Sequence, residues 1–256
     1  MDSSLECEYI LEVKDLEKSY RADFGAEKVT YPVLKGITFQ VEPQEFIGVM
    51  GRSGCGKTTL LKTLGMLNRP DKGTVFYGGV NTQRISGDAL ARIRRKEAAF
   101  IFQDFRLMDS LSVRENIMLP LILNEDDHKE SLQAVAETAE KFGILPLLDK
   151  KPYALSGGEK QRAAICRAMV MDPKLILADE PTGNLDSKSS ETVIEYLADI
   201  NRELGKTVVL VTHDPQIASY CSRILFLKDG LVLEDLRRTG NRQEFYREIL
   251  HRMIEL

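Results

Sequence analysis

The sequence predicts an α/β fold with a mostly parallel core sheet, an antiparallel β-subdomain near the N-terminus and an inserted α-helical subdomain. After Ser156, apolar strand-like segments alternate with helical segments, which is typical of a parallel sheet. In the N-terminal third, residues 37–41 alternate apolar and polar side chains, the pattern of a half-buried antiparallel strand. Between about residues 104 and 155 the spacing of apolar residues is mostly helical instead.

The individual elements follow from apolar periodicity and from glycine or proline at their ends. The continuous apolar runs Phe46–Met50 and Leu175–Asp179 predict buried strands. The other expected strands are residues 10–13, 73–77, 100–102, 207–212 and 224–228. The expected helices are residues 57–67, 113–121, 129–142 and 188–204, one that begins after Ser156, and one at the C-terminus.

The C-terminal segment differs from the rest, so we expect a main domain over residues 1–236 and a helical tail over residues 237–256. Apolar residues recur every four positions in the tail, which predicts an amphipathic helix. The two rows are Phe245, Ile249, Met253 and Tyr246, Leu250, Ile254. Packing on its own domain is the favoured interpretation of this stripe, and docking of a partner is the alternative.

Composition narrows the class of protein. The 256 residues are 43% hydrophobic and 29% charged, as in globular proteins, and the net charge of −4 argues against a protein that coats nucleic acid. No apolar run approaches the roughly 18 residues of a membrane helix, and the first residues lack the pattern of a secretory leader. Four cysteines without a C-x-x-C pair favour a reducing compartment over disulfides or a metal site. We expect a chain that does not cross a membrane by itself.

The strongest chemical signal is the glycine-rich segment between the strand at residues 46–50 and the helix that begins near residue 57. It matches G-x-x-x-x-G-K-[ST], a loop whose backbone N–H groups converge on phosphate oxygens at a helix N-terminus. Lys57 is expected to reach the β- and γ-phosphates, and the Thr58 hydroxyl to bind Mg²⁺. The expected phosphate-binding residues are Gly51, Arg52, Ser53, Gly54, Cys55, Gly56, Lys57, Thr58 and Thr59.

Two adjacent carboxylates follow the buried strand at residues 175–179. Carboxylates at the C-terminal end of a strand in an open α/β sheet face the ligand crevice. Asp179 is therefore a candidate residue for holding Mg²⁺ through water, and Glu180 is a candidate base that orients the attacking water. An exposed acidic pair before a turn is the alternative. The chain lacks an N-K-x-D motif, which argues against a GTPase.

A third motif, Leu-Ser-Gly-Gly-Glu-Lys-Gln-Arg at residues 155–162, opens a helix. Ser156 and Glu159 have the spacing of a capping box, and a capped N-terminus with two glycines also favours an anion. The motif resembles the signature of the ATP-binding-cassette (ABC) ATPases, usually L-S-G-G-Q, with Glu at the last position. The resemblance implies that Ser156, Gly157, Gly158 and Glu159 face the γ-phosphate of an ATP held by the opposite subunit.

With the three motifs in order, the resemblance to ABC ATPases extends from about Ile10 to Gly230 and implies further roles. Gln103 resembles the glutamine that senses Mg²⁺ and the attacking water. Asp186 resembles the aspartate of the loop that crosses the dimer interface, and it is also a candidate helix N-cap. His213 resembles the histidine that binds the γ-phosphate. Tyr20 is the first candidate for stacking on adenine, with Phe24 and Tyr31 as rivals.

The same resemblance implies a function. It indicates a subunit that binds ATP with Mg²⁺, dimerises head to tail around the nucleotide, hydrolyses it and drives an integral membrane permease from the cytoplasmic face, without nucleic acid. The chain is similar to macrolide-export and lipoprotein-release ATPases, and the tail sequence at residues 240–246 is similar to bacitracin-type ATPases, whose permeases often act with a sensor histidine kinase. A cell-division-type ATPase is a further alternative. We also expect solvent to reach the Cys55 thiol in the empty site, so that thiol reagents inhibit and ATP protects.

Overall fold

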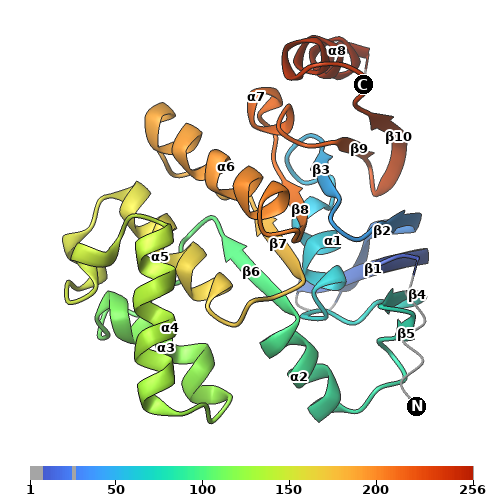
Figure 1. The fold of residues 1–256 in the computed structure, drawn as a ribbon. Coiled ribbons are helices and arrows are strands. Elements are labelled where there is room, and N and C mark those ends of the chain that lie inside the picture. The colour runs from blue at the N-terminus through green and yellow to red at the C-terminus, as the bar shows by residue number, and fades with distance from the viewer. Residues whose placement is uncertain (1–7, 25–26, 256) are drawn as a thin grey trace. The chain divides into compact units, whose positions relative to one another are not determined.

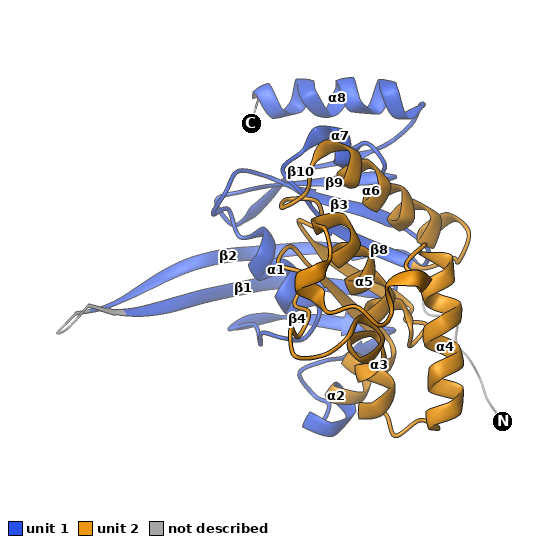
Figure 2. Ribbon diagram, turned by 90° about the vertical axis from the view of Figure 1, so that its left-hand side faces the viewer, with its two compact units in different colours: residues 1–90, 207–256 blue, residues 91–206 orange. Residues whose placement is uncertain are grey.

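In a computed structural model, residues 8–24 and 27–255 are described, and the chain divides into two compact units (Figures 1 and 2). Unit 1 contains the described residues of 1–90 and 207–256, and unit 2 contains residues 91–206. The described part of the chain has no helix with both the length and the apolar character needed to cross a bilayer.

Unit 1 contains an antiparallel sheet in the order β2-β1-β4-β5. Its strands are β1 (Leu11–Phe24), β2 (Glu27–Val41), β4 (Lys72–Tyr77) and β5 (Val80–Asn81). β1 and β2 form a hairpin that is far longer than the strands expected from the sequence, and Figure 2 shows it extending beyond the rest of its unit. The described side chains in the outer half of the hairpin are mainly exposed or half-buried, so this part of the sequence carries no strong apolar alternation.

The second sheet of unit 1 is built around β3 (Phe46–Met50), which pairs in parallel with β8 (Thr207–Val211) and with β9 (Arg223–Lys228). β10 (Leu231–Arg237) adds an antiparallel edge to β9. Every residue of β3 and β8 is buried, as their continuous apolar sequences predict. The helix α1 (Lys57–Leu64) follows β3, and the short α7 (Pro215–Ala218) follows β8.

The tail forms α8 (Arg242–Glu255), which packs beside α7 within unit 1 (Figure 1). Phe245 and Ile249 are buried, and the guanidinium of Arg242 lies 4.3 Å from the centre of the Tyr220 ring. The favoured interpretation, packing of the apolar stripe on its own domain, is thus confirmed for the first turns of the helix. Toward its end the stripe becomes exposed, because Met253 is 39% and Ile254 is 85% accessible.

Unit 2 contains the parallel pair of strands β6 (Ala98–Phe102) and β7 (Leu175–Asp179). The helix α2 (Gly87–Lys96) precedes β6 along the chain, and unit 2 begins within this helix at residue 91. Its other helices are α3 (Val113–Leu123), α4 (His128–Lys141), α5 (Gly157–Met169) and α6 (Ser187–Arg202), with short 3₁₀ turns at Leu145–Leu147 and Pro152–Ala154. α3, α4 and α5 pack on one another through buried side chains such as Ile117 and Val135. The helical character expected for residues 104–155 is confirmed.

Candidate functional site

The glycine-rich loop connects the end of β3 to α1, and its backbone depends on glycine at two positions. Gly56 has a φ of +107°, and a Cβ there would lie 3.0 Å from both a Leu34 methyl carbon and the Val33 carbonyl oxygen. A Cβ at Gly51 would collide with the Leu227 carbonyl oxygen at the end of β9. Neighbouring strands therefore enclose the loop so closely that side chains are excluded from these two positions.

The Lys57 side chain is buried inside the loop. Its Nζ donates to the carbonyl oxygens of Gly51 at 2.8 Å and of Arg52 at 3.1 Å. Gly56 is the N-cap of α1 and supplies no side-chain hydrogen bond, and the first turn holds no acidic residue. The first N–H groups of a helix have no partner within the helix, so this end suits a bound anion.

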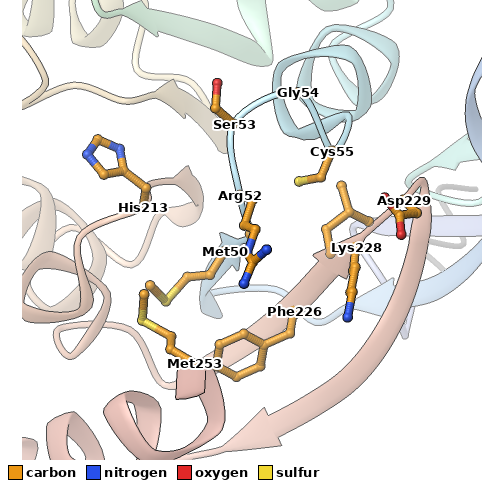
Figure 3. Close-up of a pocket in the computed structure, with 12 residues that line it drawn as sticks. Met50, Arg52, Ser53, Gly54, Cys55, His213, Phe226, Lys228, Asp229 and Met253 are labelled. Atoms are coloured by element: carbon orange, nitrogen blue, oxygen red, sulfur yellow. The ribbon is translucent and has the colours of Figure 1, made fainter. Parts of the chain in front are cut away.

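A cavity of about 560 Å³ lies beside the first half of this loop in unit 1 (Figure 3). His213, which follows β8, lines it together with Arg52 and Ser53 of the loop, and Phe226 and Met253 form apolar parts of its wall. The structure thus brings the predicted γ-phosphate histidine and the first residues of the phosphate loop to one cavity.

The cysteines correct one expectation. Cys55 is only 8% exposed, and burial raises the pKa of its thiol, so the expectation of a solvent-accessible thiol is wrong. The cause is the close approach of β9, because the carbonyl of Leu227 and the Cys55 sulfur both lie against Gly51. Cys166 and Cys221 are buried, as their apolar surroundings predict, and Cys7 lies outside the described residues.

The candidates for adenine stacking lie on the β1–β2 hairpin. Tyr20 is 43% exposed, and its hydroxyl accepts a hydrogen bond of 2.9 Å from the side-chain amide of Asn68, a contact that the sequence did not predict. Tyr31 lies directly opposite on β2 and is 46% exposed. The side chain of Phe24 lies outside the described residues. Both tyrosine side chains are exposed, Asn68 holds the hydroxyl of Tyr20, and the Lys18 ammonium lies 5.8 Å from the centre of the Tyr20 ring.

In unit 2 the predicted carboxylates come at the end of β7 and in the turn that follows. Asp179 is the last residue of the strand, and both it and Glu180 are half-buried. Glu180 has a φ of 44°, an uncommon conformation for a residue other than glycine, and its carbonyl accepts from the N–H of Gly183. The turn therefore directs the chain sharply away from the strand immediately after the acidic pair.

Gln103, just after β6, lies against the loop that follows this turn. Its Nε2 donates to Oδ1 of Asn184 at 3.3 Å, and Nδ2 of Asn184 donates to the Gln103 carbonyl at 3.2 Å. The residues after Gln103 are held by Arg167 of α5, which donates to the carbonyls of Phe105 at 2.9 Å and Arg106 at 2.5 Å. Sequence patterns did not reveal the roles of Asn184 and Arg167, because both contacts join residues distant along the chain.

The start of α5 carries the predicted capping box. Ser156 Oγ accepts from the Glu159 N–H at 3.3 Å, and Glu159 Oε2 accepts from the Ser156 N–H at 2.7 Å. The hydrogen bond that the Glu159 carboxylate accepts from the Ser156 N–H is the main cause that lowers the pKa of Glu159. The neighbouring glycines contact the loop before α6: a Cβ at Gly157 would lie 3.1 Å from a Leu185 methyl carbon, and one at Gly158 would lie 2.8 Å from Ser189 Oγ.

Asp186 acts as the N-cap of α6, as its position predicts. Its Oδ1 accepts from the Ser189 N–H at 3.0 Å and its Oδ2 from the Ser189 hydroxyl at 2.7 Å. These hydrogen bonds lower the pKa of Asp186. Unit 2 therefore brings Gln103, the two signature glycines and the loop up to Asp186 together around residues 183–189.

The predicted metal ligands suit Mg²⁺ better than a transition metal. Thr58, Gln103 and Asp179 offer hydroxyl, amide and carboxylate oxygens, the donors that Mg²⁺ prefers. Residues 8–24 and 27–255 contain no group of three or more His, Cys, Asp or Glu side chains that could hold a metal ion by themselves. Mg²⁺ commonly takes one or two protein carboxylates and completes its shell with phosphate oxygens and water, which this donor set allows.

Comparison with known proteins assigns the chain to one family. The model of the ABC transporter family matches residues 34–183. The chain is 47% identical over 241 residues to the ABC transporter ATP-binding protein YxdL of Bacillus subtilis, covering 94% of this chain and 92% of the relative. It is 42% identical over 242 residues to the bacitracin export ATP-binding protein BceA of Halalkalibacterium halodurans, covering 94% of each.

Other relatives and a solved structure agree with this assignment. Relatives named for lipoprotein release and for macrolide export are 43% and 39% identical to the chain, respectively. The dimeric structure of the ATP-binding cassette MJ0796, bound to ADP and phosphate, superposes with a TM-score of 0.81 at 37% identity, covering 90% of this chain and 99% of that one.

Proposed function

This chain belongs to the ABC transporter family as an ATP-hydrolysing subunit of the group that includes bacitracin-export, lipoprotein-release and macrolide-export ATPases, and we propose that it powers a permease for antimicrobial peptides of the bacitracin type. The observation that carries the nucleotide role is the start of α1. There a buried lysine and a helix end without a side-chain cap follow a loop closed by glycines. This combination suits a polyphosphate.

In the proposed reaction, Lys57 exchanges its loop carbonyls for the β- and γ-phosphate oxygens, and the first N–H groups of α1 bind the same anion. Thr58, Asp179 and Gln103 would hold Mg²⁺, which supplies charge neutralisation on the phosphates when bound. Glu180 accepts a proton from the attacking water, and His213 donates a hydrogen bond to the γ-phosphate. Tyr20 stacks on the adenine ring.

The start of α5 completes the site of a second copy in this proposal. ABC ATPases work as dimers, and the solved relative MJ0796 is dimeric with ADP and phosphate bound. Ser156, Gly157 and Gly158 of one copy would face the γ-phosphate bound by the other, so ATP holds the two copies together only in the closed state. Hydrolysis removes this link, and the separation of the copies drives the permease.

Replacing the proposed base tests the reaction. Glu180→Gln keeps the size of the side chain but cannot take a proton, so hydrolysis should fall by roughly 10²-fold or more while ATP binding persists. Asp179→Asn is the matched comparison, because it should weaken the Mg²⁺-dependent part of ATP binding as well. Normal turnover by Glu180→Gln would exclude Glu180 as the base.

The relative named for bacitracin export supports the proposed substrate class. We place the chain at the cytoplasmic face of the membrane, bound to its permease, with a sensor histidine kinase as a further partner of that permease. Lipoprotein release and macrolide export are the second candidate, favoured by relatives named for those functions. Purification of the chain with its membrane protein distinguishes them: a permease whose overexpression raises bacitracin tolerance supports the first, and one that releases lipoproteins supports the second.

A further inference from the structure

The contact between Gln103 and Asn184 determines how each amide is oriented. A backbone carbonyl can only accept a hydrogen bond, so the group of Asn184 that meets the Gln103 carbonyl at 3.2 Å must be its Nδ2. Oδ1 of Asn184 then lies on the other side of the amide, where it can only accept. The Gln103 group that meets it at 3.3 Å must therefore be Nε2.

This pairing leaves Oε1 of Gln103 as the atom of its amide that is not used in binding Asn184. A flipped Gln103 amide would place two acceptors, Oε1 and Oδ1, against each other, which is unfavourable. The backbone carbonyl of Gln103 thus sets the orientation of its own side chain through Asn184. An amide oxygen is a ligand that Mg²⁺ accepts, whereas an amide nitrogen is not.

The shape of the loop supports the same arrangement independently. A Cβ at Gly183 would lie 2.8 Å from Nε2 and 3.1 Å from Cδ of Gln103. Glycine at this position lets the Gln103 amide lie flat against the loop, within reach of Asn184. On either side of Gln103, Gln161 donates to the Phe102 carbonyl at 3.4 Å and Arg167 to the carbonyls of residues 105 and 106.

We propose that Asn184 is a positioning residue that orients Gln103 so that its Oε1 is presented to the nucleotide-bound Mg²⁺. This inference rests on the proposed function, in which Gln103 is a metal ligand. Asn184 is exposed and touches no reacting atom in this account, and its hydrogen bonds compete with water. Its loss should therefore change metal-dependent binding much more than stability.

The test measures the affinity of a fluorescent ATP analogue with saturating Mg²⁺ and with EDTA, in full-length chains that carry Glu180→Gln to prevent turnover. The ratio of the two affinities reports the gain due to the metal. Loss of an outer-shell partner typically lowers metal affinity about 10- to 100-fold, so we expect Asn184→Ala to reduce this gain by about tenfold. The affinity in EDTA should not change, which separates positioning from a general structural defect.

Asn184→Leu keeps the number and branching of the side-chain heavy atoms without either hydrogen bond and should show the same loss of Mg²⁺-dependent affinity. Asn201→Ala is the matched control, because Asn201, near the end of α6, also donates from Nδ2 to a backbone carbonyl, that of Lys206 at 2.8 Å. Asn201→Ala should keep the full Mg²⁺-dependent gain in nucleotide affinity. Combining Asn184→Ala with Gln103→Ala should give no larger loss than Gln103→Ala alone, since both act through one oxygen.

The outcomes separate this inference from the proposed function. If Gln103→Ala keeps the full Mg²⁺-dependent gain, Gln103 is not a ligand, and the metal assignment and the role of Asn184 are both wrong. If Gln103→Ala loses the Mg²⁺-dependent gain in affinity but Asn184→Ala and Asn184→Leu keep it, the proposed function stands and the positioning role is wrong. The same conclusion follows if the losses of Gln103→Ala and Asn184→Ala add in the double variant. A fall in the nucleotide affinity of Asn184→Ala that is as large in EDTA as in Mg²⁺ would also contradict the positioning role.

Discussion

The N-termini of α1 and α5 both follow glycine-rich sequence, yet their first turns are completed in different ways. α1 begins at Gly56 with no side-chain cap and no acidic residue in its first turn. α5 begins with the Ser156–Glu159 capping box, which uses two N–H groups and places a carboxylate in the first turn. The first helix end therefore has no side-chain cap of its own, whereas the second is capped by its own side chains.

The difference explains how one chain can carry two unlike halves of a nucleotide site. An end without a cap, with Lys57 buried beside it, suits tight binding of a polyphosphate. A capped end that keeps its shape in the absence of ligand suits a surface that meets phosphate only when another copy presents it. On this view α1 supplies affinity, and α5 supplies a preformed contact.

Removing the lysine should have the largest effect. Lys57→Ala deletes the charge-assisted contact with phosphate; with a net loss of about 1.5–3 kcal/mol, ATP affinity should fall on the order of 10- to 100-fold. Lys160→Ala, in the first turn of α5, is the matched control and should bind ATP normally. Isothermal titration calorimetry measures the ATP affinity of both variants. Equal losses of affinity in Lys57→Ala and Lys160→Ala would contradict the distinction between the two helix ends.

Adding a methyl group to the loop tests whether its glycines are required by the fold. Gly56→Ala meets both a φ of +107° and the packed Val33 and Leu34, so it should lower the free energy of unfolding by about 2–3 kcal/mol. Gly54→Ala has a φ of +81° but nothing within 4 Å of the new Cβ, and it should cost only about 1 kcal/mol. Urea unfolding measures the free energy of unfolding of both variants. A larger loss of stability in Gly54→Ala than in Gly56→Ala would contradict the described packing.

The smallest expected effect concerns the charge at α5. Hydrogen bonds from Ser156 lower the pKa of Glu159, so the ionised carboxylate stabilises the folded state. This contribution, below about 1 kcal/mol, is present above the ordinary carboxyl pKa and is lost as the pH falls through the lowered value. Glu159→Gln should therefore be less stable than the natural chain at neutral pH and equal to it in strong acid.

The same substitution should act in the opposite direction on dimerisation. Without the carboxylate, less negative charge faces the γ-phosphate, so Glu159→Gln should dimerise at lower ATP concentration. Thermal unfolding from pH 7 to pH 3 and light scattering with ATP measure the two effects. A stability difference that persists unchanged to pH 3 would show that the charge of Glu159 is not its cause.

The contrast between the helix ends was largely predictable from sequence because it depends on local patterns. The loop at residues 51–58 and the S-x-x-E spacing each lie within one short segment, and the capping box and the N-cap role of Asp186 are confirmed. The helix α2 was missed because Leu90 and Ile93 are the only large apolar residues in its sequence, and none of its residues is buried.

Contacts between distant segments could not be predicted. Gln103 and Asn184 are 81 residues apart, and neither residue type indicates the other. The burial of Cys55 depends on β9, which the chain reaches far later. Sequence patterns therefore supply the candidate residues for the chemistry, while the structure was needed to find which residues contact them.

The central claim is that α1 of one copy and α5 of another enclose the same ATP. Its most direct test mixes two inactive variants. Lys57→Ala loses the phosphate-binding half. Gly157→Asp adds a charge at the start of α5, where a new Cβ would lie 3.1 Å from the flexible Leu185 side chain and 3.6 Å from the Asn184 carbonyl oxygen. In a head-to-tail dimer of the two, one site combines both intact halves. We predict that the mixture regains Mg²⁺-dependent ATPase activity that neither variant has alone; a mixture as inactive as its components would contradict the claim.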